Sequence, residues 1–244
     1  MTRPYEIWIN GYYHMSGGIR ALHVLKDELI KRGYPAHMRY EHHDPESIAV
    51  YPEIVSNNPD NYKYITRWKL NHAVLPDDGL TFAWEKNMDE EKLLTVSVIE
   101  PHLWTPYDGP RSGVAYWIGK GSFDSSVIPE GAFEINRGNF TQREVLADRI
   151  KTLDYLISFD SFTAVNLEAI LCGTPVVIVS NHDYWTREKV ESHDYYKYGV
   201  SWGMENIEKA REEVHLAFDN YQSFLPIFDK RIDDFIQLTQ ETFI

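Results

Sequence analysis

The sequence is poor in cysteine, in basic runs and in long apolar stretches, and each of these features excludes or disfavours one class of protein. A single cysteine, Cys172, among 244 residues excludes intramolecular disulfides and fits a reducing compartment. The net charge is −13 and no basic stripe offsets it, which disfavours nucleic acid as a partner. No apolar stretch approaches the roughly 20 residues that cross a bilayer, and the N-terminal residues lack a signal-peptide core. We therefore expect a cytoplasmic protein without a membrane span.

What is present is an ordinary globular composition, 43% hydrophobic and 25% charged, in which short apolar runs alternate with helical patterns. Such a chain can bury a core without a metal or a disulfide. Strands are predicted at 5–10, 35–39, 51–55, 80–84, 93–99, 113–118, 132–135, 155–158 and 176–179. Helices are predicted at 19–32, 61–73, 141–151 (with Thr141 as N-cap), 164–172 and 205–244, the last broken near Pro226.

This alternation predicts an α/β fold with two Rossmann-like domains. The expected division is an N-terminal domain at 1–100, a linker at 101–112, a C-terminal domain at 113–225 and a final helix at 226–244. Runs that are apolar on both faces suit buried parallel strands. Ligands of such sheets bind beyond the carboxyl ends of the strands, so we expect an active site in the interdomain cleft.

The segment 153–179 holds the most informative pattern in the chain. A strand ends in the acidic residue Asp160, a helix carries Glu168 eight residues later, and Cys172-Gly173-Thr174-Pro175 precedes the next strand. This order resembles the donor-binding signature of retaining GT-B-type glycosyltransferases, the group 1 or family 4 nucleotide-sugar enzymes. That signature has two glutamates eight residues apart, so this chain departs from it by carrying Asp160 at the first position.

The resemblance implies that Glu168 accepts hydrogen bonds from the nucleotide ribose. It also implies that Asp160, as a catalytic residue, and the loop Ser161, Phe162 and Thr163 face the donor sugar and diphosphate. A carboxylate suits vicinal hydroxyls, and a helix N-terminus suits phosphate. The structural alternative is that Asp160 and Thr163 cap a helix while Glu168 forms a surface ion pair. Cys172 is interpreted as a small buried residue and not as a nucleophile.

Two further segments resemble parts of the same family. Residues 14–20, which open the first helix, resemble its glycine loop, with Gly17 and Gly18 beside the donor phosphates and Arg20 within reach of one. Residues 116–121 resemble its strand–glycine–cation element, in which Lys120 stabilises the leaving diphosphate. The alternatives are a simple turn for the glycines, a solvated residue for Arg20 and a surface lysine for Lys120. The family usually carries a second cation a few residues away; here only Lys120 is clear, and Arg137 and Arg143 are weak candidates for the missing partner.

The function that the resemblance implies is transfer of a sugar from a nucleoside-diphosphate-sugar donor to a hydroxyl acceptor, with retention. The acceptor would be a glycan, a lipid-linked sugar, a small molecule or, less favoured by the charge, a modified DNA base. No metal or other cofactor is expected, because His42-His43-Asp44 has no third ligand at suitable spacing. Two alternatives stay open: a nucleotide-sugar 2-epimerase-like enzyme and a catalytically inactive nucleotide- or sugar-binding module.

Overall fold

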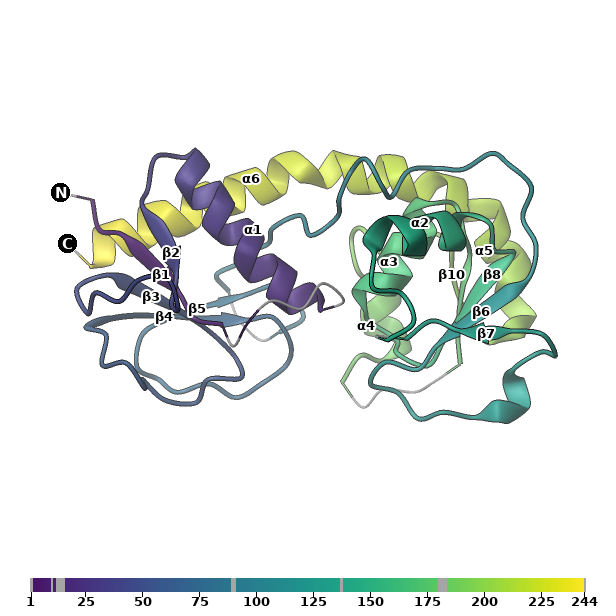
Figure 1. Ribbon diagram of the computed structural model, residues 1–244, viewed down its shortest axis with the longest axis horizontal. Helices are drawn as coiled ribbons and strands as arrows, with labels where there is room; N and C mark the ends of the chain where they lie inside the picture. Colours follow the sequence, from purple (N-terminus) through teal and green to yellow (C-terminus); the bar gives the residue numbers. More distant parts are fainter. Residues whose placement is uncertain are drawn as a thin grey trace. The chain divides into compact units, whose positions relative to one another are not determined.

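The computed structural model describes residues 2–9, 11, 16–88, 91–136, 138–179 and 184–243. The chain divides into two compact units, which are 1–98 together with 225–244 and 99–224 (Figure 1). Each unit is built on one five-stranded sheet in which all neighbouring strands are parallel. The α/β class predicted from the sequence is therefore confirmed. No helix among the described residues is long and apolar enough to cross a membrane.

The first unit has the strand order β2-β1-β3-β4-β5. Its elements are β1 (Tyr5–Ile7), α1 (Gly17–Lys31), β2 (Ala36–Met38), β3 (Ile48–Pro52), β4 (Tyr64–Lys69) and β5 (Leu80–Ala83). It also takes the part of α6 (Ala217–Thr242) that follows Phe224. The residues predicted to form the final helix thus belong to the same compact unit as the N-terminal strands.

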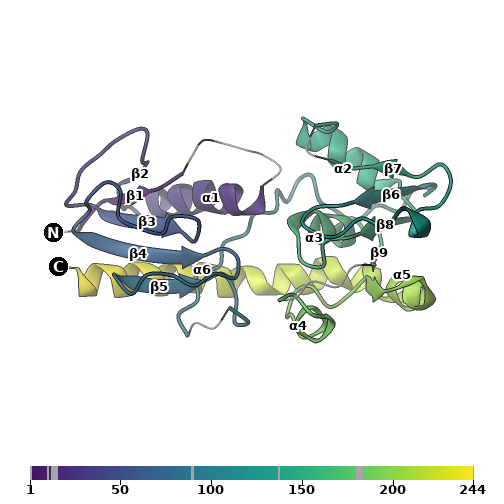
Figure 2. The same ribbon diagram turned by 90° about the horizontal axis from the view of Figure 1, so that it is seen from below.

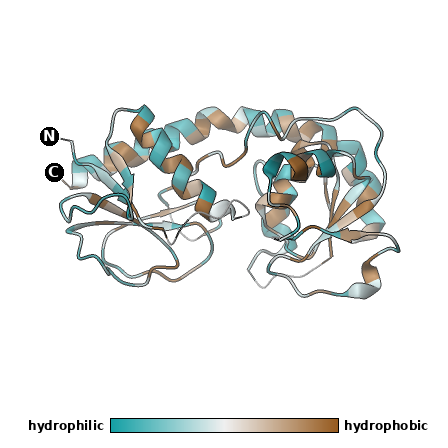
Figure 3. Cartoon of the chain, in the orientation of Figure 1, coloured by the Kyte–Doolittle hydropathy of each residue, from teal (hydrophilic) through white to brown (hydrophobic). Residues whose placement is uncertain are grey.

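Two helices cover one face of this sheet (Figure 2). On α1 the buried residues Leu22, Leu25 and Leu29 recur at helical spacing, as the sequence predicts. On α6 the ring of Phe235 lies 5.7 Å from that of Tyr5 and 5.0 Å from that of Phe82. Figure 3 shows both helices with hydrophobic and hydrophilic sides, as expected where one side of a helix packs on a core.

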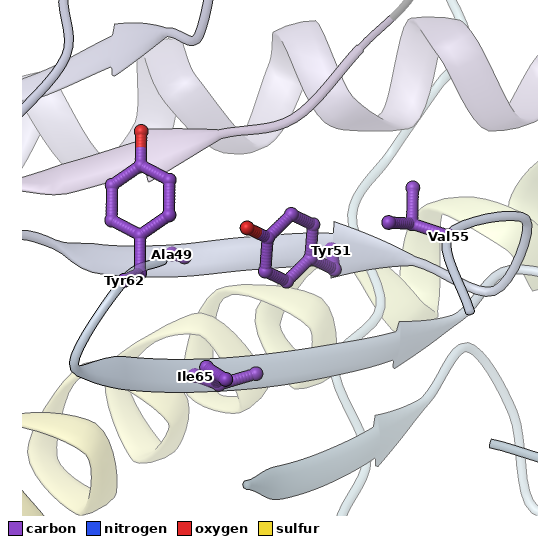
Figure 4. Packing of buried hydrophobic residues seen from close by; sticks show 5 residues of the cluster. All are labelled: Ala49, Tyr51, Val55, Tyr62 and Ile65. Atoms are coloured by element: carbon purple, nitrogen blue, oxygen red, sulfur yellow. The ribbon is translucent and has the colours of Figure 1, made fainter. Parts of the chain in front are cut away.

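The opposite face of the same sheet is covered by loops. The connections 53–63 and 70–79, which the structure describes in full, contain no helix. A small core fills the space between loop and sheet, and Figure 4 shows its residues Ala49, Tyr51, Val55, Tyr62 and Ile65. Loops carry backbone polar groups that need partners, so this face needs polar side chains to hold them.

The second unit has the strand order β10-β9-β8-β6-β7 and more helices between its strands. Its elements include β6 (Val114–Trp117), β7 (Phe133–Glu134), α2 (Arg143–Lys151), β8 (Tyr155–Ser158), α3 (Ala164–Leu171), β9 (Val176–Ile178), α4 (Arg187–Glu191), β10 (Val200–Trp202) and α5 (Ile207–Glu213). Residues 101–112, expected to be a linker, are part of this unit.

Several local predictions were wrong. The helix expected at 61–73 is the strand β4, because its β-branched and aromatic residues are buried on both faces of the sheet. The strand expected at 93–99 is only one isolated bridge, from Leu93 to Ala83. Thr141 is not the N-cap of α2; Gln142 holds that position, without a side-chain bond. The last helix is not broken at Pro226, since α6 runs through it with buried residues on either side.

Candidate functional site

Unit 2 has a topological switch point between two adjacent parallel strands. β6 continues to β7 on one side of it, and β8 continues to β9 on the other. In an open parallel sheet, the loops that leave two such strands separate and create a crevice beyond the carboxyl ends. The two segments that leave this point are 118–121, which begins the connection from β6 to β7 and holds Lys120, and 159–163, which joins β8 to α3 and holds Asp160.

The two loops are joined by a hydrogen bond. The backbone N–H of Lys120 donates to Oδ2 of Asp160 at 3.1 Å. Gly119 has a φ of +58°, and a Cβ there would collide with both the carboxylate of Asp160 and the indole nitrogen of Trp117. A Cβ on Gly121 would collide with the carbonyl oxygen of Phe159. Only glycine allows the turn to pack this closely against the end of β8.

Buried polar side chains fix the backbone at Asp160, a residue that is itself only 4% exposed. Its carbonyl oxygen accepts hydrogen bonds from Ser158 Oγ and from Asn166 Nδ2, both at 2.8 Å. Tyr196 is buried beside this loop, with its ring 5.3 Å from that of Phe162, and burial raises the pKa of its phenol well above its usual value. The backbone that carries the Asp160 carboxylate is thus fixed at the switch point. Sequence reasoning missed Ser158, Asn166 and Tyr196, because no local pattern connects them to Asp160.

Positive charge is available beside this carboxylate. The side chain of Lys120 is exposed, and among the described residues its ammonium group has no hydrogen-bond or ion-pair partner. The N-cap of α3, Thr163, makes no side-chain capping bond, so the first turn keeps N–H groups that its cap does not satisfy. A lysine and an open helix N-terminus are the groups that bind phosphate in proteins.

The other two residues of the predicted loop anchor it to the protein. Ser161 donates through Oγ to the backbone oxygen of Trp185 at 2.9 Å. The ring of Phe162 stacks on that of Trp185 at 4.1 Å and contacts His193 and Tyr196. These contacts position the loop, and the side chain of the N-cap Thr163 makes no helix-capping bond of the kind that the structural alternative expected.

Glu168 has a different environment, because it is fully buried in an ion-pair cluster. Its Oε1 and Oε2 accept hydrogen bonds from Arg143 Nη2 at 2.6 Å and Arg143 Nη1 at 3.3 Å. The same guanidinium donates to both oxygens of Glu100 and lies 4.8 Å from the centre of the Trp104 ring. Glu168 is therefore paired, as its structural alternative expected, but inside the protein and not on its surface.

The two carboxylates of the Arg143 cluster stabilise the charged form of the Arg143 guanidinium. Burial alone would lower the pKa of the Arg143 guanidinium, but the negative charges of Glu168 and Glu100 outweigh burial and raise it. Two carboxylates share one cation, and Trp104 Nε1 donates to Glu100 Oε2 at 2.9 Å. Contact of Glu168 with a ribose stays a prediction, and it would require this fully buried carboxylate to become accessible.

The residues Cys172 to Pro175 have a structural explanation. Gly173 ends α3 with a φ of +79°, and Thr174 Oγ1 donates to the carbonyl of Ile150 at 2.8 Å. Arg111 donates to Thr174 Oγ1 at 2.6 Å and to the carbonyl of Cys172 at 2.7 Å. These two hydrogen bonds attach the segment 105–112 to this unit. Burial raises the pKa of the Cys172 thiol to about 12, so a thiolate nucleophile is disfavoured there.

The predicted N-terminal residues Gly17, Gly18 and Arg20 lie in unit 1. The glycines are the first two residues of α1, whose N-cap Ser16 accepts the N–H of Ile19. Arg20 is 4% exposed and donates to the carbonyl of Val98 at 3.1 Å, so it is not the solvated residue of the alternative. Residues 12–15 and Arg137 lie outside the described residues.

The histidine run of unit 1 surrounds a buried carboxylate. Glu6, which is 1% exposed, accepts hydrogen bonds from His42 Nδ1 at 2.9 Å, from the backbone of Asp44 and from Tyr62. His43 Nδ1 bonds to the Tyr62 hydroxyl at 3.0 Å. Among the described residues, no group of three or more His, Cys, Asp or Glu side chains is arranged to hold a metal ion.

Comparison with known proteins assigns neither a family nor a function to this chain. No protein-family model matches the chain, and a search of curated proteins found no match. The fold and the contacts of the described residues therefore carry the functional argument, together with the resemblance of segments 14–20, 116–121 and 153–179.

Proposed function

We propose that this chain is a glycosyltransferase of the GT-B class, which moves a sugar from a nucleoside-diphosphate-sugar donor to a hydroxyl acceptor with retention. The observation that carries the proposal is the junction of the Lys120 turn with the carboxylate of Asp160 at the switch point of unit 2. A carboxylate beside a free lysine and an open helix N-terminus suits a ligand that carries both hydroxyl and phosphate groups.

Each of these groups would act on a different part of the donor. The bond between the anomeric carbon and the diphosphate oxygen breaks with its electron pair on the diphosphate, and the acceptor oxygen bonds to the anomeric carbon. The acceptor proton passes to the departing phosphate oxygen. Lys120 and the first turn of α3 would stabilise the negative charge that grows on the diphosphate. Asp160 would orient the sugar through its hydroxyl groups.

The proposal is tested by a thermal-shift screen with UDP, GDP, ADP and CMP and with their sugar conjugates. A ligand at about 100 times its dissociation constant adds roughly 2.7 kcal/mol to the stability of the folded state. The conjugate that binds is then incubated with candidate glycan, lipid-linked and small-molecule acceptors. Nuclear magnetic resonance of the product gives the anomeric configuration, which we expect to be retained.

Matched variants distinguish a loss of sugar transfer at the site from a loss of folding stability. Asp160→Asn and Lys120→Ala should abolish transfer while leaving the melting temperature without ligand nearly unchanged. Asp154 lies at the opposite end of β8 and accepts the N–H of Gly113 at 3.0 Å, so Asp154→Asn removes a similar bond away from the site. Lys209→Ala removes an exposed lysine elsewhere in unit 2. Full activity in both Asp160→Asn and Lys120→Ala would contradict the proposal.

A further inference from the structure

The switch point of unit 2 holds a buried hydrogen-bond donor without an acceptor. Trp117 is the last residue of β6 and is 4% exposed. Its indole Nε1–H is buried and has no hydrogen-bond partner among the residues that the structure describes. A buried donor without a partner destabilises the folded state, and an acceptor that a ligand brings to it removes that cost.

The unpaired donor lies beside the carboxylate of Asp160. A Cβ placed on Gly119 would meet both Trp117 Nε1 and Asp160 Oδ2 within 2.5 Å of the same position. The two atoms are therefore at most about 5 Å apart, a span that one oxygen atom can bridge with two ordinary hydrogen bonds. Oδ2 accepts the N–H of Lys120, and an ionised carboxylate offers about four lone-pair sites, so it can accept hydrogen bonds from several donors.

A donor and an acceptor that converge in this way match one chemical group best. A hydroxyl group accepts one hydrogen bond and donates another, so it can satisfy Trp117 Nε1–H and Asp160 Oδ2 together. A phosphate oxygen at neutral pH only accepts, and its charge is repelled by the carboxylate. We propose that Trp117 and Asp160 together recognise one hydroxyl group of the donor sugar, an inference that rests on the proposed function and makes Trp117 a specificity-determining residue.

The turn that carries Lys120 has to move for this hydroxyl to enter. Trp117 Nε1 is covered, and the turn Gly119–Gly121 lies against Trp117 and the end of β8. Its flanking glycines allow a range of backbone conformations that other residues do not. Sugar binding would thus shift Lys120 at the same time as it fills the Trp117–Asp160 pair.

Trp202 provides a matched control for Trp117, because the two residues lie at the same level of the sheet. Trp117 is in register with Ser158, Ser158 with Ile178, and Ile178 with Trp202 on the outer strand β10. Trp202 is 9% exposed, and its Nε1 is likewise buried without a partner among the described residues. Trp202→Phe therefore removes the same group at the same level of the sheet, three strands away from β6.

The experiment follows the indole N–H signals of the ¹⁵N-labelled full chain. Trp117→Phe and Trp202→Phe assign two of the signals by their disappearance. The sugar conjugate should shift the Trp117 signal and slow its exchange with solvent, whereas the nucleoside diphosphate alone should leave both unchanged. By titration calorimetry, Trp117→Phe should weaken conjugate binding about fivefold, the effect of one neutral hydrogen bond, and leave diphosphate binding unchanged. Trp202→Phe should change neither affinity.

The outcomes distinguish a failure of this inference from a failure of the proposed function. If the wild-type chain binds no nucleotide or conjugate, the proposed function fails, and free monosaccharides at high concentration supply the hydroxyl group for the same Trp117 signal. A Trp117 signal that shifts with a monosaccharide supports the hydroxyl site by itself. A signal that neither conjugate nor monosaccharide moves overturns the inference, as does a Trp117→Phe variant that loses diphosphate and conjugate affinity equally.

Discussion

The two units have the same strand order, because each places its second strand outside the first and its third to fifth strands on the other side. They differ in what covers the sheet and in where the buried charges lie. In unit 1 the buried Glu6 and Arg67 lie within strands and hold loops against a face that carries no helix among the described residues. In unit 2 helices follow β7, β8 and β9, and Asp160 lies just past a strand end.

The two buried charges of Arg67 and Asp160 differ in their position along a strand and in the groups around them. Arg67, with no exposed side-chain surface, donates to the carbonyls of Val55 and Asn57 and pairs with Asp78, so these hydrogen-bond partners belong to the loops that it holds. Asp160 lies where a parallel sheet opens to ligands, and the Lys120 turn meets it there. We therefore expect substitutions in unit 1 to affect stability first and those at Asp160 to affect ligand binding first.

The largest expected effect is that of Arg67→Met. The substitution leaves the two carbonyl groups and Asp78 without their partner, and losing one side of a buried ion pair costs about 3–5 kcal/mol. Hydrogen exchange by mass spectrometry should show lost protection across 48–83 and little change in 113–178. Arg187→Met, which removes an exposed pair with Glu191, is the control. A loss of less than about 1 kcal/mol would contradict the structural role.

Glu168→Gln is expected to have the next largest effect, because it tests whether Glu168 follows the pattern of unit 1 inside unit 2. Its carboxylate is fully buried on Arg143, so replacement by an amide should cost about 2–3 kcal/mol of unfolding free energy. Glu191→Gln removes an exposed pair and should cost less than about 0.5 kcal/mol. Denaturant unfolding measures both. If Glu168→Gln is as stable as wild type but loses nucleotide affinity, Glu168 is a ligand contact and not a structural one.

Gly119→Ala should have a smaller effect on stability and a specific one on the site. An alanine at positive φ costs about 1–2 kcal/mol, and its Cβ would also displace Asp160 and Trp117. Gly131→Ala is the control, because Gly131 has a φ of +82° and nothing near its Cβ position. Calorimetric titration should show that Gly119→Ala loses nucleotide affinity and Gly131→Ala keeps it. Equal behaviour of the two variants would show that the close packing of this turn is irrelevant to binding.

The smallest expected effect is the pH dependence of unit 1. A hydrogen bond from Arg67 lowers the pKa of Asp78, and one from Arg39 lowers the pKa of Asp60. Because these folded-state pKa values lie below the unfolded ones, both pairs stabilise the fold above the unfolded pKa of about 4. That stabilisation is lost as the pH falls through the folded values. Melting curves between pH 6 and 3 should show a weaker pH dependence for Asp78→Asn than for wild type.

The sequence predicts the parts of this fold that local patterns determine. The helix of Leu22, Leu25 and Leu29 and the strand-to-helix run around Asp160 are present as expected, because periodicity reports burial on one face. The strand β4 was missed because a short segment buried on both faces has no distinctive period.

Long-range partners are the part that the sequence does not contain. Arg111 reaches Thr174 across 63 positions, and Arg143 reaches Glu168 across 25. Both contacts involve the segment 153–179, whose local pattern gives no sign of either partner. Such partners decide whether Glu168 is available to a ligand, so a motif alone does not determine its role.

The most direct test of the difference between the units is hydrogen exchange by mass spectrometry with and without nucleotide, using UDP, GDP and ADP in turn. If the Lys120 and Asp160 loops are the ligand site, the nucleotide that binds should slow exchange in peptides that cover 117–121 and 159–164. Peptides that cover Glu6 and Arg67 should be unchanged. Protection confined to residues 1–98, with none at the ends of β6 and β8, would contradict the account.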